Sequence, residues 1–176
     1  MKFIYAGRLE NIKGTHILLE GWKKFSNLNS TLTICGCGDL ERWSKEYIRT
    51  NKLTNIEMKG FLSNIVVKQL IGNSDALLIP SQCYEGFPMT ILEAFSLGIP
   101  VIVGNIGNAG SLVENRITGL KFIYDSADDL ARCLTEFCLL SDINWKVNID
   151  KTYKRFMPEN NYLQLLQIYK KLKNIK

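Results

Sequence analysis

Short runs of apolar residues alternate along this chain with longer segments in which apolar residues recur at the spacing of an α-helix. The apolar runs predict strands at 2–7, 31–36, 55–60, 75–80, 99–103 and 119–123. The amphipathic segments between them predict helices at 15–26, 40–50, 66–73, 89–98 and 127–140. A regular alternation of strand and helix is typical of a parallel sheet covered on both faces. The pattern therefore predicts an α/β fold with a single Rossmann-like, doubly wound parallel sheet of about six strands.

The last part of the chain follows a different pattern. After a core that spans 2–140, the segment 141–176 predicts two helices, at 142–156 and 159–173, which are separated at Pro158. The second helix carries an apolar stripe formed by Tyr162, Leu165, Leu166 and Tyr169. We interpret the whole chain as one domain, because no repeat, low-complexity stretch or linker interrupts it.

Composition is that of an ordinary globular protein, with 46% hydrophobic and 22% charged residues among 176. No apolar run approaches the length of a membrane span, and the N-terminus lacks the anatomy of a signal peptide. Because a strand begins at once, we expect a further segment to precede it in the natural protein. The five cysteines form no metal-ligand pattern, which favours reduced thiols in a cytoplasmic protein. His16 is the only histidine and lies in a helix opening, so a His-based triad or zinc site is disfavoured.

Positive charge is concentrated near the C-terminus. The net charge is +5, and residues 146–176 hold eight Lys or Arg residues against two acidic ones. A basic surface of this kind fits a solvated helix face, an anionic membrane surface or a nucleic acid. The solvated face is the commonest of these three.

The stretch 81–100 carries the strongest sign of a ligand site. Glu85 and Glu93 stand eight positions apart around the predicted start of a helix, directly after the strand at 75–80. In open α/β sheets, ligands bind at the carboxyl ends of the strands. Glu93 is suited to accept hydrogen bonds from the two hydroxyls of a ribose, and Glu85 from those of a sugar. On spacing alone, a solvated loop residue and a surface helix residue explain the two carboxylates equally well.

The residues between the two carboxylates indicate an anionic ligand. Gly86 lets the backbone approach a ligand closely, and Pro88 fits the first helical position, where a missing N–H costs nothing. The free amides of Met89, Thr90 and Ile91 would then carry the positive end of the helix dipole. This arrangement is suited to a phosphate.

The loop after the first strand carries two cations between two glycines. Arg8 and Lys13 are flanked by Gly7 and Gly14. An arginine offers a fork of donors and a lysine a mobile point charge, and together they suit a diphosphate. A solvated basic loop is the alternative.

Glycines also follow the second strand. Gly36 and Gly38 resemble part of a dinucleotide fingerprint, but Glu41 stands where the third glycine is required, which disfavours a dinucleotide oxidoreductase. We interpret the two glycines as a tight turn that keeps side chains out of a ligand crevice. Phe61, after the third strand, is expected to offer an aromatic edge to the same crevice. The glycine-rich stretch 104–115 is predicted to be a loop that contributes backbone to the site or is solvated.

Four motifs occur in order along the chain: GRLxxxKG, GxGxLE, GFL and PSxxxEGFPxxxLEAxxxGxPV. Their series resembles that of the C-terminal, donor-binding domain of the family 4 (group 1) retaining glycosyltransferases, which have the GT-B fold. The resemblance covers about 3–140, and the segment with Glu85 and Glu93 is its most specific element. It implies that this chain is one half of a GT-B fold, with the N-terminal acceptor-binding domain absent from the sequence.

The resemblance also implies a nucleotide-sugar donor site. Its catalytic residues would be Arg8 and Lys13, which hold the diphosphate and offset charge on the leaving phosphate, and Glu85, which contacts the donor sugar. The residues implied in binding the donor and its nucleotide are Gly7, Gly36, Gly38, Phe61, Gly86, Phe87, Pro88, Met89, Thr90 and Glu93. The family's mechanism needs no cofactor, and the chain has no D-x-D motif, so we expect metal independence.

The implied function is donor binding within an enzyme that synthesises a cell-surface polysaccharide or a lipid-linked glycan. Its expected partners are the nucleotide-sugar donor, the N-terminal domain and an acceptor that is lipid-linked or presented at a membrane surface, with no role for nucleic acid. We expect a cytoplasmic chain, or one peripheral to the inner face of the membrane, that binds the donor without transferring the sugar alone. The alternatives are a non-catalytic nucleotide-sugar binding module and a fragment of a sugar-nucleotide epimerase.

Overall fold

The fold is built on a single parallel sheet. The computed structural model describes residues 1–173, and the strand order is β3-β2-β1-β4-β5-β6, with every neighbouring pair parallel. The strands are β1 (Lys2–Ala6), β2 (Thr31–Cys35), β3 (Ile56–Gly60), β4 (Ala76–Ile79), β5 (Val101–Gly104) and β6 (Gly119–Phe122). The order of the strands reverses between β1 and β4, which makes this the switch point of a doubly wound sheet. The predicted fold class and number of strands are confirmed.

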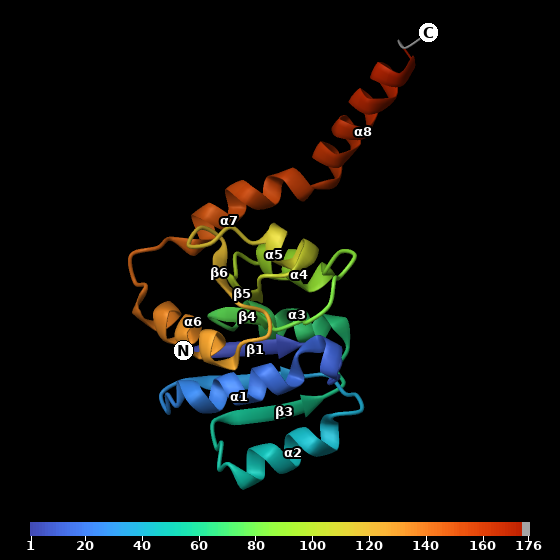
Figure 1. Ribbon diagram of the computed structural model, residues 1–176. Helices are drawn as coiled ribbons and strands as arrows, with labels where there is room; N and C mark the ends of the chain where they lie inside the picture. The colour runs from blue at the N-terminus through green and yellow to red at the C-terminus, as the bar shows by residue number, and fades with distance from the viewer. Residues whose placement is uncertain (174–176) are drawn as a thin grey trace.

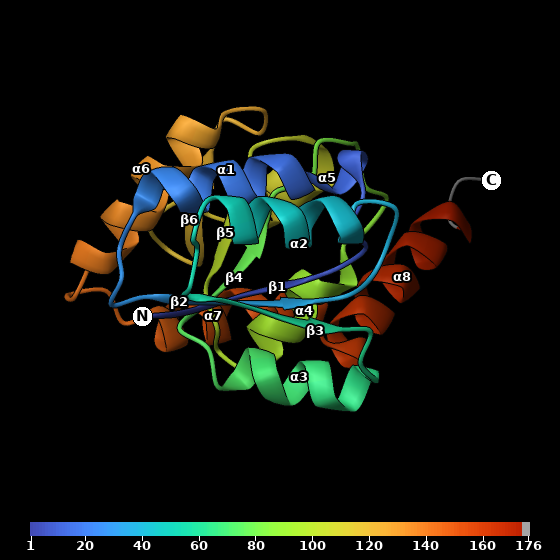
Figure 2. The same ribbon diagram turned by 90° about the horizontal axis from the view of Figure 1, so that it is seen from below.

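Helices cover both faces of the sheet. They are α1 (Thr15–Phe25), α2 (Glu41–Thr50), α3 (Asn64–Gly72), α4 (Met89–Ser96), α5 (Gly107–Leu112), α6 (Ala127–Leu139), α7 (Trp145–Tyr153) and α8 (Pro158–Lys173), with 3-10 turns η1 (Asn11–Lys13) and η2 (Lys154–Phe156). Helices α1, α2 and α6 lie on one side of the sheet, and α3, α4 and α7 lie on the other (Figure 2). The result is the three-layer arrangement that the alternation of elements predicted.

The period of two in the strands separates the core into two layers. In β1, Phe3 and Tyr5 point to the layer under α1 and α6, whereas Ile4 points to the layer under α3 and α4. Helices α1 and α6 approach each other closely because Gly21 has no side chain. A Cβ atom there would lie 2.7 Å from Cδ2 of Leu130. This tight packing holds β1 and its loop in place below the candidate site.

Two details of the element boundaries concern the second half of the chain. Ser126 caps α6, since its Oγ accepts a hydrogen bond from the N–H of Asp129 at 3.1 Å. The prediction of a loop across 104–115 was wrong, because α5 forms within it. Ala109 and Leu112 are buried against the sheet, and this packing stabilises a short helix despite its glycines.

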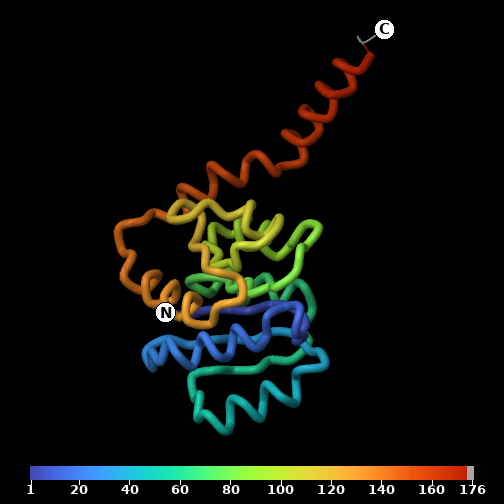
Figure 3. The backbone as a smooth tube through the Cα atoms, in the orientation of Figure 1, coloured from blue at the N-terminus to red at the C-terminus, as the bar shows by residue number. Residues whose placement is uncertain are grey.

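The C-terminal helix projects from the body of the molecule. Helix α7 is anchored through the fully buried Ile149, whereas α8 extends away from the sheet and its helices (Figures 1 and 3). Helix α8 has no buried residue, and its exposed apolar side chains are Tyr162, Leu163, Leu165, Ile168, Tyr169 and Leu172. None of the helices in residues 1–173 combines the length and the apolar character needed to cross a membrane. The predicted apolar stripe therefore exists but contacts little of this chain.

Candidate functional site

The candidate site lies where the parallel strands end. The arrowheads of β1 and β3 point to the same edge of the sheet (Figure 1), so the loops after β1, β2, β3 and β4 gather there. These four loops contain every residue that the sequence analysis assigned to catalysis or donor binding, apart from three in the first turns of α4. The switch point between β1 and β4 is also at this edge.

A largely apolar cavity of about 450 Å³ opens at this edge, between the ends of β1, β2 and β3 and the start of α4. Seven predicted residues line it: Gly7, Arg8, Gly36, Gly38, Phe61, Thr90 and Glu93. Leu62, the last residue of the GFL motif, forms part of its apolar wall together with Val67, which sequence reasoning did not identify. An apolar cavity with a few convergent polar groups is typical of a small-molecule site.

The glycines after β2 have a more specific role than the predicted one. A Cβ atom on Gly36, whose φ is +136°, would lie 1.9 Å from the carbonyl oxygen of Gly7. A Cβ atom on Gly38 would lie 2.5 Å from that of Leu9. The N–H of Leu9 donates to Cys37 O at 2.9 Å. The glycines therefore let two strand-end loops pack backbone against backbone, which forms one wall of the cavity.

A smaller cavity of about 100 Å³ lies beside the first and shares Ala6, Gly7 and Thr90 with it. Here Nζ of Lys13 lies 2.9 Å from Oε1 of Glu85. The hydroxyl of Ser81 donates a hydrogen bond to the same Oε1. The structure thus brings together two residues that are 72 positions apart and that were predicted to be catalytic.

Gly14 explains why Lys13 reaches Glu85. The residue has φ +73°, and a Cβ atom on it would lie 1.8 Å from the carbonyl oxygen of Pro80. The N–H of Gln82 donates to Ile12 O at 2.9 Å beside this contact. The loop after β1 is therefore pressed against the loop after β4, and no side chain larger than hydrogen fits between them.

Arg8 occupies a different place from Lys13. It lines the larger cavity, is largely exposed and forms an ion pair with Glu10 at 2.7 Å. The hydroxyl of Tyr5 donates to Arg8 O at 2.6 Å and so holds the backbone of this loop. Burial, together with the charge of Glu85, raises the pKa of Tyr5 above its ordinary value. Tyr5 also lines the smaller cavity and was not identified from sequence, although its alternation with Phe3 places it inside the fold.

The start of α4 differs from the prediction in two ways. Pro88 is the residue before the helix, not its first residue, and Met89 is the first. The N–H of Ile91 donates to Pro88 O at 3.1 Å, so this amide is not free. The amides of Met89 and Thr90 precede the first intrahelical hydrogen bond and can serve a ligand.

Four predicted donor-binding residues, Gly86, Phe87, Pro88 and Met89, line neither cavity. Gly86 O accepts a hydrogen bond from Nδ2 of Asn108 at 2.5 Å, and the ring of Phe87 packs edge-on against Phe156 at 6.2 Å. These contacts tie their loop to α5 and to η2, and the loop thereby holds Glu85 in place. Sequence spacing did not reveal either tertiary contact.

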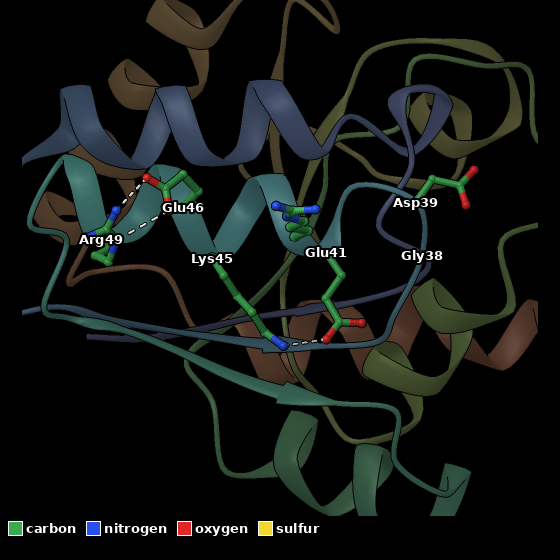
Figure 4. Close-up of a pocket in the computed structure, with 7 residues that line it drawn as sticks. Gly38, Asp39, Glu41, Lys45, Glu46 and Arg49 are labelled. Carbon is green, nitrogen blue, oxygen red and sulfur yellow. Dashed lines mark hydrogen bonds and ion pairs between the residues drawn. The ribbon is translucent and has the colours of Figure 1, made fainter.

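A more open hollow of about 550 Å³ lies along α2 and the loop before it (Figure 4). Its charges largely pair with one another: Lys45 with Glu41 at 2.6 Å, and Arg49 with Glu46 at 2.7 Å. These are exposed pairs between neighbouring turns of one helix. We assign the ligand site to the strand-end cavities, where polar groups from several elements converge. No group of three or more potential metal ligands occurs in the described part of the chain.

Comparison with known proteins identifies the family. A model described as "Glycosyl transferases group 1" matches residues 1–144. The chain belongs to this family. This glycosyltransferase chain is 33% identical over 123 residues to glycogen synthase of Mycobacterium tuberculosis. The aligned residues cover 68% of this chain and 30% of that protein. It is 26% identical over 142 residues to the amylovoran biosynthesis glycosyltransferase AmsK of Erwinia amylovora, covering 76% and 35%.

Solved structures share the fold. The lipopolysaccharide outer core galactosyltransferase WaaB superposes with a TM-score of 0.84 at 28% identity, over 97% of this chain and 49% of that one. HepE of Anabaena, in a complex with UDP and glucose, gives a TM-score of 0.77 at 22% identity, over 99% and 48%. The family predicted from the motif series is confirmed. The chain spans about a third of the two curated relatives and about half of these two structures.

Proposed function

We propose that this glycosyltransferase chain is the nucleotide-sugar donor-binding half of a retaining enzyme. The observation that carries the proposal is the pair of adjoining cavities at the switch point of the sheet. The larger one offers an apolar wall and the carboxylate of Glu93, and the smaller one offers Lys13 beside Glu85. A nucleoside in the first and a sugar in the second place the diphosphate between them, near Gly7 and Thr90.

Each part of the donor has matching chemistry in this arrangement. The base lies near Phe61, and the ribose hydroxyls donate to Glu93. Arg8, Lys13 and the amides at the start of α4 bind the diphosphate and offset the charge that develops on the leaving phosphate. Glu85 accepts a hydrogen bond from a hydroxyl of the donor sugar. The proposed site uses no metal, because cations and helix amides supply the positive charge.

The transfer reaction requires a second domain that holds the acceptor. Support for this comes from the shares of the structures that the chain covers, about half in each of the two superposed. Helix α8, with exposed apolar side chains, offers a surface for such a domain. In the proposal, the chain by itself binds the donor without transferring the sugar, since water reaches the open cavities.

We propose that the reaction is a step in the synthesis of a cell-surface polysaccharide or a lipid-linked glycan. Relatives with such names, among them an amylovoran biosynthesis enzyme, support this. The positive side chains of α7 and α8 fit a cytoplasmic chain that touches the inner face of a membrane carrying the acceptor. A non-catalytic nucleotide-sugar binding module is the second candidate, favoured by a donor-sized cavity that the described residues form by themselves.

Calorimetric titration with UDP, GDP, ADP and CMP tests the proposal. We expect one diphosphate to bind saturably, and we expect Arg8→Ala and Glu93→Ala each to weaken it about tenfold, as loss of a charge-assisted hydrogen bond does. Arg42→Ala is the matched control, because Arg42 lines the hollow along α2 and neither strand-end cavity. Binding that is unchanged in Arg8→Ala and Glu93→Ala, or no binding of any nucleotide, would overturn the donor site.

A further inference from the structure

The carboxylate of Glu85 is held through one of its two oxygens. Oε1 accepts a hydrogen bond from Ser81 Oγ and lies 2.9 Å from Nζ of Lys13. Within residues 1–173, Oε2 has no hydrogen-bond partner. All three side chains line the smaller cavity. One oxygen is therefore committed to the protein, and the other is left to accept a hydrogen bond from a ligand.

Ser81 is fixed by the fold. It directly follows Pro80 after β4 and is only 4% exposed. Its neighbour Gln82 is tied to the loop after β1 through the hydrogen bond to Ile12 O. A hydroxyl in such a position has little freedom to turn to water, so its hydrogen bond to Glu85 defines the orientation of the carboxylate.

We propose that Ser81 is a positioning residue that holds Oε1 of Glu85, so that Oε2 can accept a hydrogen bond from a hydroxyl of the donor sugar. This inference rests on the proposed function. In that function Lys13 turns to the diphosphate once the donor is bound, and it then shares its charge with the phosphate oxygens. Ser81 is the remaining protein donor to Oε1, and without it the carboxylate is free to rotate away from the sugar. Ser81 thereby contributes to selection of the sugar and not of the nucleotide.

The test compares nucleotides with and without a sugar. The full chain is titrated with UDP, GDP and ADP and with UDP-glucose, UDP-galactose, GDP-mannose and ADP-glucose, and the gain in affinity due to the sugar is the readout. We expect Ser81→Ala to reduce this gain about tenfold while the affinity for the diphosphate alone changes by less than about twofold. Ser44→Ala is the matched control, because Ser44 is equally buried in α2, lacks a hydrogen-bond partner and lies in neither cavity.

A double-mutant cycle separates positioning from a general structural effect. If Ser81 acts through Glu85, Ser81→Ala adds no further loss to the affinity for the sugar nucleotide in a Glu85→Ala background. Additive losses would overturn the inference, as would a sugar that adds no affinity in the unmodified chain or a gain that survives in Ser81→Ala. If no diphosphate binds the unmodified chain, the proposed function itself fails, so the two failures are distinguishable.

Discussion

At the residue scale, the candidate site depends on two opposite charges in a partly buried position. The side chains of Lys13 and Glu85 are 24% and 17% exposed. A charge removed from water needs a partner of opposite charge, and here Lys13 and Glu85 are partners of each other. The ion pair keeps the cation at the smaller cavity, and in the proposed function a diphosphate would compete with Glu85 for Lys13. Arg8, paired with Glu10 at the surface, is subject to much weaker constraints.

A pH dependence of stability is expected from Cys133, which lines neither cavity of the candidate site. Burial raises the pKa of the Cys133 thiol from 9.0 to about 11, and its Sγ lies 3.2 Å from Lys121 O. The unfolded chain therefore releases this proton first, so the contribution of Cys133 is intact below pH 9 and is lost as the pH rises toward 11. We expect Cys133→Ala to flatten the decline in the free energy of unfolding over this interval.

Urea unfolding at a series of pH values measures this decline. The two proteins are compared by the slope of the free energy of unfolding against pH, because Cys133→Ala also removes buried atoms and lowers stability at every pH. Part of the slope at higher pH remains in the variant, since burial also raises the pKa of Tyr5. A slope equal to that of the unmodified chain would contradict the assignment to Cys133.

At the scale of elements, the site is made by contacts between loops that follow different strands. The loop after β1 packs on the loop after β4 through Gly14, and on the loop after β2 through Gly36 and Gly38. The first contact brings Lys13 to Glu85, and the second forms a wall of the larger cavity. The site therefore depends on close backbone contacts as much as on its charged side chains.

Substitution of Gly14 tests this dependence. Gly14→Ala introduces a Cβ atom 1.8 Å from Pro80 O at φ +73°, so we expect a large loss of stability and of nucleotide affinity. Gly60→Ala is the matched control, because Gly60 has a similar φ of +67° but nothing lies within 4 Å of its Cβ position. The control should lose only about 1–2 kcal/mol for the left-handed conformation. Urea unfolding of both variants provides the measurement, and equal losses would contradict the proposed contact.

At the scale of the whole molecule, α8 stands apart from a core that is complete without it. Within residues 1–173, no residue after Ile149 of α7 is buried. Helix α8 projects from this body (Figure 1), and its apolar side chains other than Leu166 and its basic side chains up to Lys173 are exposed. Its stripe of apolar side chains therefore contributes little to the stability of this chain.

Removal of α8 tests this conclusion. A chain that ends at residue 157 keeps the contact between Phe87 and Phe156, and we expect its free energy of unfolding to match that of the full chain within about 0.5 kcal/mol. Ile149→Ala in the full chain is the contrasting variant, with an expected loss of about 2–5 kcal/mol for a fully buried side chain. A large loss on truncation would show that α8 packs on the core.

The sequence alone identified about half of the residues that line the two cavities, because loops after parallel strands meet at one edge by necessity. Arg8, Lys13, Glu85, Thr90 and Glu93 all lie there. Sequence reasoning did not identify Ser81 or Tyr5, whose roles depend on hydrogen bonds to particular atoms of other residues. Nor did it place the loop of Gly86 and Phe87, whose contacts come from distant segments of the chain.

By itself, the sequence determined the fold class, the strands and the family, since these follow from the periodicity of apolar residues and from motifs in chain order. Only the tertiary structure decided which charges meet and which glycines are required. The pair of Lys13 and Glu85 and the approach of Gly14 to Pro80 are contacts across about seventy positions. They depend on how two loops pack against each other, and the spacing of residues along the chain does not specify that packing.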